Sequence, residues 1–301
     1  MRTSGRGAAF HFPGGIVRRI TMSLAAVLLL ALGTGCSSGS SESGSSEKDR
    51  VTEKPGGRAG AKASATKGTD GRPVDIVRAA VAKARATSAR IDEKIVLSDG
   101  TRTYTLSIAG PFDMARDKGT LSVDFPGGAV DHIDEIFSRG RIYLTPMQPA
   151  IPKGAWASIA RDKVEAHSLL RAPANDPEHV LRQIAAMRKV TRFGTETVGG
   201  RPATRYRGSL DTATLSLGLT AKARRSLAKL HEMIRTDLPV FTDAWVDRAG
   251  RIVRVRLTHR FQTDSAEVTM TLSSFGQPVK AVAPDGSLTV PVMSVSGALP
   301  G

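Results

Sequence analysis

Apolar and polar residues alternate with period two through much of the chain between residues 91 and 272. The pattern is clear in Ile91–Leu97, Tyr104–Ile108 and Val268–Leu272. In a strand, this alternation places the apolar side chains on one face and the polar ones on the other. Strands of this kind suit an antiparallel sheet that has one covered face and one face in water. The sequence therefore predicts a long antiparallel sheet whose apolar face must be covered by other parts of the chain.

Further strands are expected wherever the alternation resumes, and tight turns join several of them into hairpins. Ser98-Asp99-Gly100 and Arg248-Ala249-Gly250 are Gly-containing turns of the sort that connects neighbouring antiparallel strands. The other expected strands are Leu121–Phe125, Ile136–Ser138, Arg141–Leu144, a short one at Trp156, Gly194–Val198, Ala203–Leu210, Val240–Asp247 and Arg251–Phe261.

Three segments show the helical period of 3.6 residues instead. Val74–Ser88 follows Pro73, which is tolerated in a first helical turn, the second helix opens at Asp176-Pro177, and the third spans Thr220–Asp237. The predicted fold class is therefore α+β, a curved antiparallel sheet covered by about three amphipathic helices. The apolar stripes are Val74, Val77, Val81 and Ala84 in the first helix, Val180, Ile184, Met187 and Thr191 in the second, and Ala223, Leu227, Leu230 and Ile234 in the third.

The N-terminal segment has the plan of a secretory signal peptide over residues 1–35. Arg18-Arg19 precede an apolar run that reaches Leu32, and Gly33-Thr34-Gly35 lead to Cys36, the only cysteine in the sequence. The run is shorter than the roughly 20 apolar residues that a spanning helix needs. The stretch resembles a bacterial lipobox, which implies cleavage between Gly35 and Cys36 and acylation of the Cys36 sulfur. The alternatives are an ordinary signal peptide with an incidental cysteine, and an uncleaved anchor.

Residues 36–72 are expected to be the lipidated cysteine and a disordered tether rich in Ser, Gly, Ala and Lys. Residues 73–301 would then form a single domain with an irregular C-terminal tail. The net charge of +15 becomes 15 − 4 = +11 when the four arginines of the leader are removed. Because the basic residues are spread through the domain, they do not favour a nucleic-acid partner. Acidic phospholipids and anionic wall polymers are the polyanions within reach of an exported protein.

A search for catalytic or metal-binding patterns predicts no enzyme, no cofactor and no metal. Ser226 and Lys229 match the Ser-x-x-Lys pattern of penicillin-recognising enzymes, but the partner motifs Ser-Asp-Asn and Lys-Thr-Gly are missing from the sequence. The histidines do not fall at metal-ligand spacing. The acidic segment Asp131–Glu135 lacks the spacing and the central glycine of a calcium loop, so we expect a solvated loop there.

Two hairpin segments carry a resemblance to a known family. They are Val198-Gly199-Gly200-Arg201-Pro202-Ala203-Thr204-Arg205-Tyr206-Arg207-Gly208 and Ala244-Trp245-Val246-Asp247-Arg248-Ala249-Gly250-Arg251-Ile252. With the cysteine, the tether and the first helix, they resemble the actinobacterial LppX/LprG-type lipoproteins of the LolA-like fold over most of residues 74–282. The resemblance implies an incomplete barrel, an apolar cavity between sheet and helices that accepts acyl chains, and no catalytic residues.

The leading hypothesis is an exported lipoprotein, anchored to membrane lipid through acylated Cys36 on the extracytoplasmic face of the cell membrane. It would be a monomer that binds an acylated lipid in this cavity, with shuttling of that lipid as an extension. The alternative is a non-catalytic interaction or sensor lipoprotein, whose filled core binds no lipid and whose basic surface docks a wall or membrane partner. The stripe residues are core residues first, and these are candidates for the cavity lining: Val77, Val81, Ile184, Met187, Leu227, Leu230 and Ile234.

Overall fold

The computed structural model describes residues 71–128, 130–147 and 151–293. The expected signal peptide, Cys36 and residues 37–70 of the expected tether lie outside these residues. No helix in the described part of the chain has the length and apolar character needed to cross a membrane.

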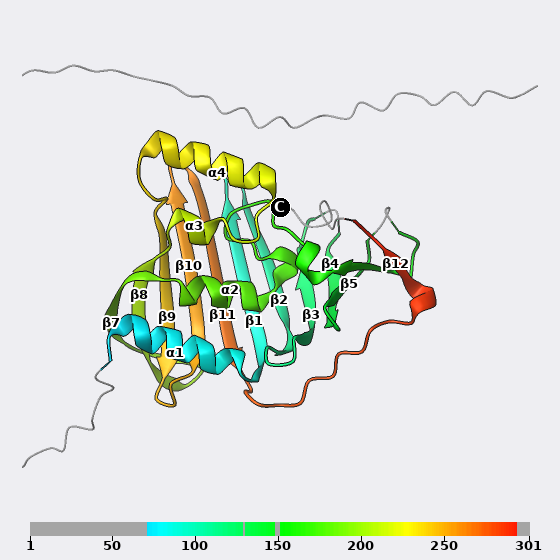
Figure 1. The fold of residues 1–301 in the computed structure, drawn as a ribbon, viewed down its shortest axis with the longest axis horizontal. Coiled ribbons are helices and arrows are strands. Elements are labelled where there is room, and N and C mark those ends of the chain that lie inside the picture. Colours follow the sequence, from blue (N-terminus) through cyan, green and yellow to red (C-terminus); the bar gives the residue numbers. More distant parts are fainter. Residues whose placement is uncertain (1–70, 129, 148–150, 294–301) are drawn as a thin grey trace, which may run out of the picture. The chain divides into compact units, whose positions relative to one another are not determined.

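Within the described residues, twelve strands form one sheet (Figure 1). Most of them coincide with the segments of alternating polarity, and strands such as Ser88–Ser98, Lys118–Asp124 and Ile252–Phe261 bury about every second side chain. The strands are β1 (Ser88–Ser98), β2 (Thr103–Asp113), β3 (Lys118–Asp124), β4 (His132–Ser138), β5 (Arg141–Thr145), β6 (Trp156–Ala160), β7 (Arg188–Val198), β8 (Arg201–Ser209), β9 (Val240–Asp247), β10 (Ile252–Phe261), β11 (Asp264–Ser273) and β12 (Thr289–Pro291).

The order of the strands across the sheet is β12-β6-β5-β4-β3-β2-β1-β11-β10-β9-β8-β7. All neighbours pair antiparallel except β12, which runs parallel to β6. β1 lies between β2 and β11, so two meanders, β1 to β6 and β7 to β11, are joined along the β1–β11 pair. The predicted α+β class with a mostly antiparallel open sheet is confirmed.

Four α-helices lie over one face of this sheet, which we call the inner face (Figure 1). Pro73 starts the first of them without needing a partner for its missing amide hydrogen. The Asp176 carboxylate accepts from the Glu178 amide at 2.9 Å and caps the second. The helices are α1 (Pro73–Arg85), α2 (Pro177–Ala185), α3 (Thr212–Leu215) and α4 (Ala221–Ile234), and the 3-10 turns are η1 (Arg161–Lys163), η2 (Pro173–Asn175) and η3 (Gly286–Leu288).

The second helix is shorter than its apolar stripe predicts. α2 ends at Ala185, Met187 follows it, and Thr191 lies in β7. The chain leaves the helix because β7 pairs with β8 from Arg188 onward. Strand pairing thus overrides the helical periodicity of the sequence after Ala185. As a result β7 is longer than the expected strand Gly194–Val198.

The C-terminal tail is also less irregular than expected. Thr289–Pro291 forms β12 and pairs with Trp156–Ser158 of β6. The Val292 amide extends this contact by donating to the Ser158 carbonyl at 3.0 Å. A strand of three residues is too short to show alternation, so the sequence pattern gave no sign of it.

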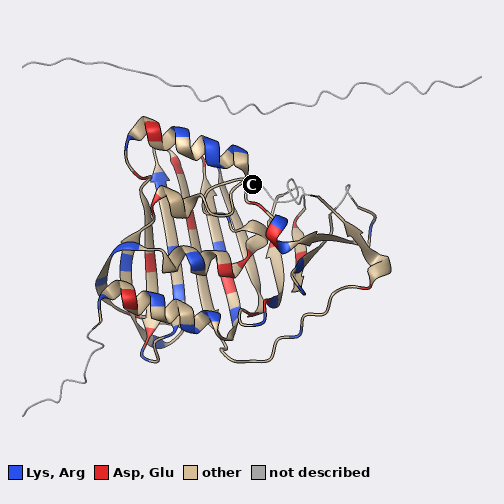
Figure 2. Cartoon of the chain, in the orientation of Figure 1, with Lys and Arg blue, Asp and Glu red and all other residues tan. Residues whose placement is uncertain are grey.

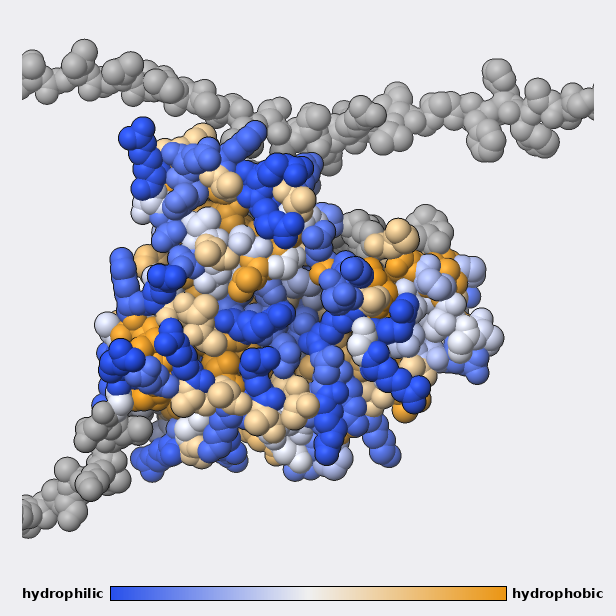
Figure 3. All heavy atoms as spheres, viewed as in Figure 1, coloured by the Kyte–Doolittle hydropathy of each residue, from blue (hydrophilic) through white to orange (hydrophobic). Residues whose placement is uncertain are grey.

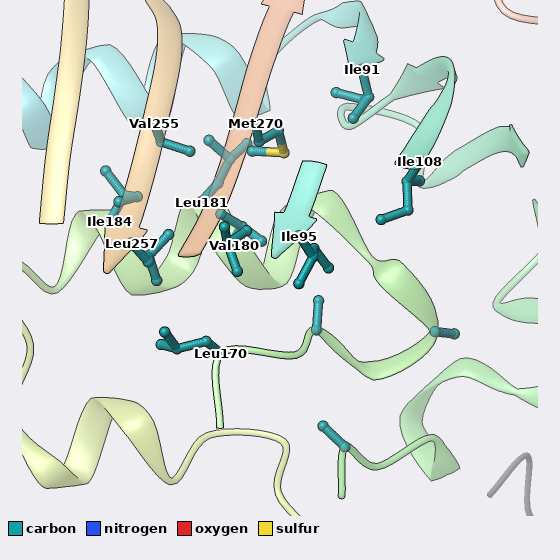
Figure 4. Packing of buried hydrophobic residues seen from close by; sticks show 14 of the residues in the cluster. Ile91, Ile95, Ile108, Leu170, Val180, Leu181, Ile184, Val255, Leu257 and Met270 are labelled. Carbon is teal, nitrogen blue, oxygen red and sulfur yellow. The ribbon is translucent and has the colours of Figure 1, made fainter. Parts of the chain in front are cut away.

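The core lies between the inner face and the helices (Figure 4). Aliphatic side chains of α2 meet those of the central strands in one hydrophobic cluster, and each residue named below is at most 2% exposed. This cluster provides the burial that holds the fold together. Members labelled in Figure 4 are Ile91, Ile95, Ile108, Val180, Leu181, Ile184, Val255, Leu257 and Met270.

Candidate functional site

The inner face and its helices contain all seven residues that the sequence proposes for a cavity lining. Four of them, on α1, on α2 or just after α2, are at most 2% exposed, and a fifth on α4 is 3% exposed. The last two, also on α4, are half-buried and pack against the same hydrophobic cluster. Their role as the lining of a lipid cavity stays a prediction. In this order the residues are Val77, Val81, Ile184, Met187, Leu227, Leu230 and Ile234.

α4 packs on the inner face less completely than α2 does. α2 buries six of its nine residues, including Leu181 and Ile184. Of the 14 residues of α4, every one of which the structure describes, Leu227 alone is buried, while Leu230 and Ile234 are half-buried. In Figure 3, which looks onto the helices, hydrophobic surface remains visible beneath α4. The apolar stripe of α4 therefore retains surface that a further apolar group can bury.

Hydrogen bonds hold α4 at its two ends. At the start, the Thr220 amide donates to the Ala166 carbonyl at 2.9 Å, and the Thr220 hydroxyl accepts from the Ala223 amide at 3.2 Å. At the end, Arg235 turns left-handed with φ of 52° and stops the helix. Just beyond, the Thr212 amide and hydroxyl donate to the Asp237 carboxylate at 3.0 and 2.8 Å. The segments on both sides of α4 are thus held in place by hydrogen bonds.

A cleft of about 670 Å³ opens where η1, the start of α2 and the loop before α4 meet. Arg161 lies in it and donates to both carboxylate oxygens of Asp176 at 2.7 and 3.1 Å, and it also pairs with Asp117. Burial lowers the pKa of His179 to about 4, so this imidazole is neutral at pH 7. The described residues that line the cleft include no serine, threonine, cysteine or lysine, and none of the seven candidate lining residues.

Two glutamates are buried on the inner face, Glu93 of β1 and Glu135 of β4, at 4% and 0% exposure. The Asn175 amide donates to Glu135 Oε1 at 2.9 Å, and Arg171 Nη2 donates to Asn175 Oδ1 at 3.1 Å. Burial raises the pKa of Glu93 to about 7 and that of Glu135 to about 8, and it lowers the pKa of Arg171. These four residues form a polar cluster inside the core, and its charge changes with pH near neutrality.

The expectation of a solvated loop over Asp131–Glu135 is wrong from His132 onward, where the chain is a strand, and both Ile133 and Glu135 are buried. Glu135 pairs with Leu121 and Leu144, both buried on the inner face, because His132–Ser138 forms β4 between β3 and β5. The sequence alone could have indicated that Glu135 is buried. Ile133, Glu135 and Phe137 are spaced by two residues, so in a strand the Glu135 carboxyl lies on the same covered face as the two apolar side chains.

The face of the sheet opposite the helices, which we call the outer face, carries a cluster of charged residues. The spacing of residues in the sequence did not predict this cluster. Arg205 donates from Nε and Nη2 to the two oxygens of Asp243, each at 2.8 Å, and from Nη1 to Glu196 at 2.8 Å. The Arg205 guanidinium lies 5.0 Å from the ring centre of Trp245, whose Nε1 donates to Glu196 at 2.9 Å. These charges are paired with one another, so we assign the cluster to stability of the sheet.

The residues considered for catalysis or metal binding do not come together. Ser226 and Lys229 both lie on the exposed surface of α4. Within the described ranges, no three His, Cys, Asp or Glu side chains gather where they could hold a metal ion. The chemistry available on the inner face is burial of apolar groups, with one buried polar cluster beside it.

Comparisons with known proteins give one relative in sequence and several in structure. No protein-family model matches the chain. An uncharacterized 31.2 kDa protein in the rplA-rplJ intergenic region of Streptomyces griseus is 29% identical over 157 residues, which are 49% of this chain and 48% of that protein. The chain thus spans about half the length of the curated relative it matches.

Solved structures of similar fold are found among bacterial lipoproteins and LolA-type proteins. LprF from Mycobacterium bovis aligns with a TM-score of 0.44 and 15% identity over 71% of this chain and 97% of its own. Mycobacterium tuberculosis lipoprotein LppX aligns with a TM-score of 0.44 and 12% identity, over 71% of this chain and 100% of its own. The LolA superfamily protein NE2245 from Nitrosomonas europaea aligns with a TM-score of 0.28 and 8% identity, over 72% of this chain and 96% of its own. The expected resemblance to LppX and to the LolA-like fold is therefore found.

Proposed function

We propose that this chain is a membrane-anchored, exported lipoprotein that binds the acyl chain of a lipid between α4 and the inner face of the sheet. The observation that supports this most is the incomplete packing of α4. Its stripe faces an apolar sheet, yet Leu230 and Ile234 remain half-buried. An alkyl chain placed there would complete the burial of both surfaces.

The energetics of such binding follow from partition between water and an apolar site. Each methylene group withdrawn from water contributes about 0.8 kcal/mol. A chain of roughly ten methylenes could therefore gain about 8 kcal/mol, which offsets the cost of association and of ordering the chain. No reacting group is needed, and the mechanism is uptake and release of a ligand. Because α4 buries few of its side chains, a modest outward shift of the helix would cost little packing and would admit the chain.

A binding experiment tests this proposal with a matched pair of variants. The chain from Ser37 onward keeps every described residue and omits Cys36. It is to be titrated with a fluorescent fatty acid, and the purified protein is to be extracted with organic solvent for mass spectrometry. We expect Leu230→Glu, on the sheet side of α4, to weaken binding about tenfold or more, since it places a charge in the apolar site. Ala228→Glu, on the exposed side, should bind like the wild type.

Two controls keep the result clear. Thermal unfolding of both variants shows whether Leu230→Glu remains folded, which separates lost binding from lost structure. If the wild-type chain binds no fatty acid and yields no lipid, the proposal fails. The same holds if Leu230→Glu and Ala228→Glu bind equally well. The first outcome would favour the alternative of an interaction lipoprotein with a closed core, and the second would place the lipid away from α4.

A further inference from the structure

The solvent side of α4 carries a stripe that its packing does not explain. Lys222, Arg225, Lys229 and Met233 are spaced by three, four and four residues, so they lie along one side of the helix. This side faces away from the sheet, because Leu227 and its half-buried neighbours occupy the other. All four side chains are exposed, and Met233 is 69% exposed. We call these four residues the α4 stripe.

The three cations of the α4 stripe differ from those of α1 in their contacts with other described residues. On α1, Lys83 donates to the Ala249 carbonyl at 2.6 Å and Arg85 pairs with Glu178 at 3.5 Å. Among the described residues, Lys222, Arg225 and Lys229 form no ion pair. Residues 220–235 contain five Lys or Arg and one Glu, a net charge of 5 − 1 = +4. Figure 2 shows this basic character along α4, at the upper edge of the view.

We propose that the α4 stripe docks the domain on an anionic phospholipid surface. Charge complementarity selects an anionic partner, because these cations pair with no acidic side chain in the part of the chain that the structure describes. Met233 selects a bilayer over a soluble polyanion. An exposed apolar side chain in line with three cations fits a surface where apolar material lies just beneath charged headgroups.

This docking does not depend on lipid binding under α4, and it is a contact separate from an anchor at Cys36. A helix lying on the membrane by its outer side keeps its inner side toward the sheet. The stripe would therefore set the orientation of the domain, with the α4 end of the sheet facing the headgroups. A basic residue near an anionic surface strengthens binding by about fivefold.

The test is sedimentation with vesicles, using the chain from Ser37 onward so that acylation cannot contribute. The vesicles contain equal parts of phosphatidylglycerol and phosphatidylcholine, and pure phosphatidylcholine serves as the neutral reference. We expect the triple variant Lys222→Glu, Arg225→Glu, Lys229→Glu to lower the partition coefficient on anionic vesicles by about tenfold or more. The matched variant Lys94→Glu, Lys153→Glu, Arg248→Glu changes the net charge equally at exposed sites outside α4, and it should bind nearly as well as the wild type.

Two further arms test the membrane assignment. Raising the salt from about 0.1 M to about 1 M shortens the screening length from about 10 Å to about 3 Å, so it should release the protein. Met233→Gln should weaken vesicle binding while leaving binding to soluble polyglutamate unchanged. The proposal is overturned if the wild type ignores anionic vesicles, if both triple variants lose binding equally, or if only polyglutamate binds through the stripe. Fatty-acid titration of the same samples reports the function under α4 separately.

Discussion

The buried carboxyl group of Glu135 makes the stability of the folded state depend on pH. Its pKa is raised by burial to about 8, well above the ordinary value of 4.5 that an unfolded chain would show. In the folded state the Glu135 carboxyl therefore keeps its proton over a pH range in which the same group in the unfolded chain has lost it. Stability is full below the ordinary pKa and declines as the pH rises toward about 8. Glu93, raised to about 7, acts in the same direction.

Glu135→Gln removes one of these protons but keeps the oxygen that accepts from Asn175. We expect this variant to lose less stability than the wild type between about pH 5 and about pH 9, and to be on the order of 1–3 kcal/mol more stable at the alkaline end. Urea unfolding at several pH values measures both. Glu165→Gln, at an exposed position, is the control and should follow the wild-type profile. A Glu135→Gln profile parallel to that of the wild type would contradict the assignment.

At the scale of elements, the start of α2 depends on one side chain with two tasks. Asp176 caps the helix through the Glu178 amide and binds the Arg161 guanidinium through both oxygens. Asp176→Ala should therefore cost about 2–4 kcal/mol, because it removes a cap and leaves a largely buried arginine without its main partner. Thr220→Ala, which removes the cap of α4 alone, should cost about 1 kcal/mol. Chemical denaturation compares the two, and equal losses would mean that the Arg161 contact contributes nothing.

The elements also show how far the sequence could lead. Alternating polarity and tight turns predicted β1, β2, β10 and β11, because these local patterns identify strands that have one face in water. The sequence pattern could not end α2 at Ala185, since that boundary depends on pairing between β7 and β8. It could not show that Asn175 meets Glu135, because the two residues are brought together by the fold. The half-buried state of Leu230 was equally out of reach, since an amphipathic pattern gives direction but not packing density.

At the scale of the whole molecule, the proposed anchor lies outside the described residues and needs its own test. Cys36→Ala should abolish incorporation of labelled palmitate and release the protein from membranes of an expressing bacterium, because no thiol remains to be acylated. Membranes are to be washed with about 1 M salt first, which removes electrostatic docking. Ser37→Ala is the neighbouring control and should stay lipidated. If Cys36→Ala remains bound at the wild-type level after the wash, the proposed anchoring through Cys36 is wrong.

The position of β1 in the middle of the sheet has a consequence for how the chain reaches its fold. Strands β1 to β6 pair in sequence order, and so do β7 to β11, whereas Arg90 of β1 must find Ser273 of β11. Pairing between distant segments forms late, because the loop it closes is long. Until it forms, β1 and β11 are both bare edges that can pair with another chain. The newly exported protein is thus most prone to aggregation between the completion of its two meanders and their union.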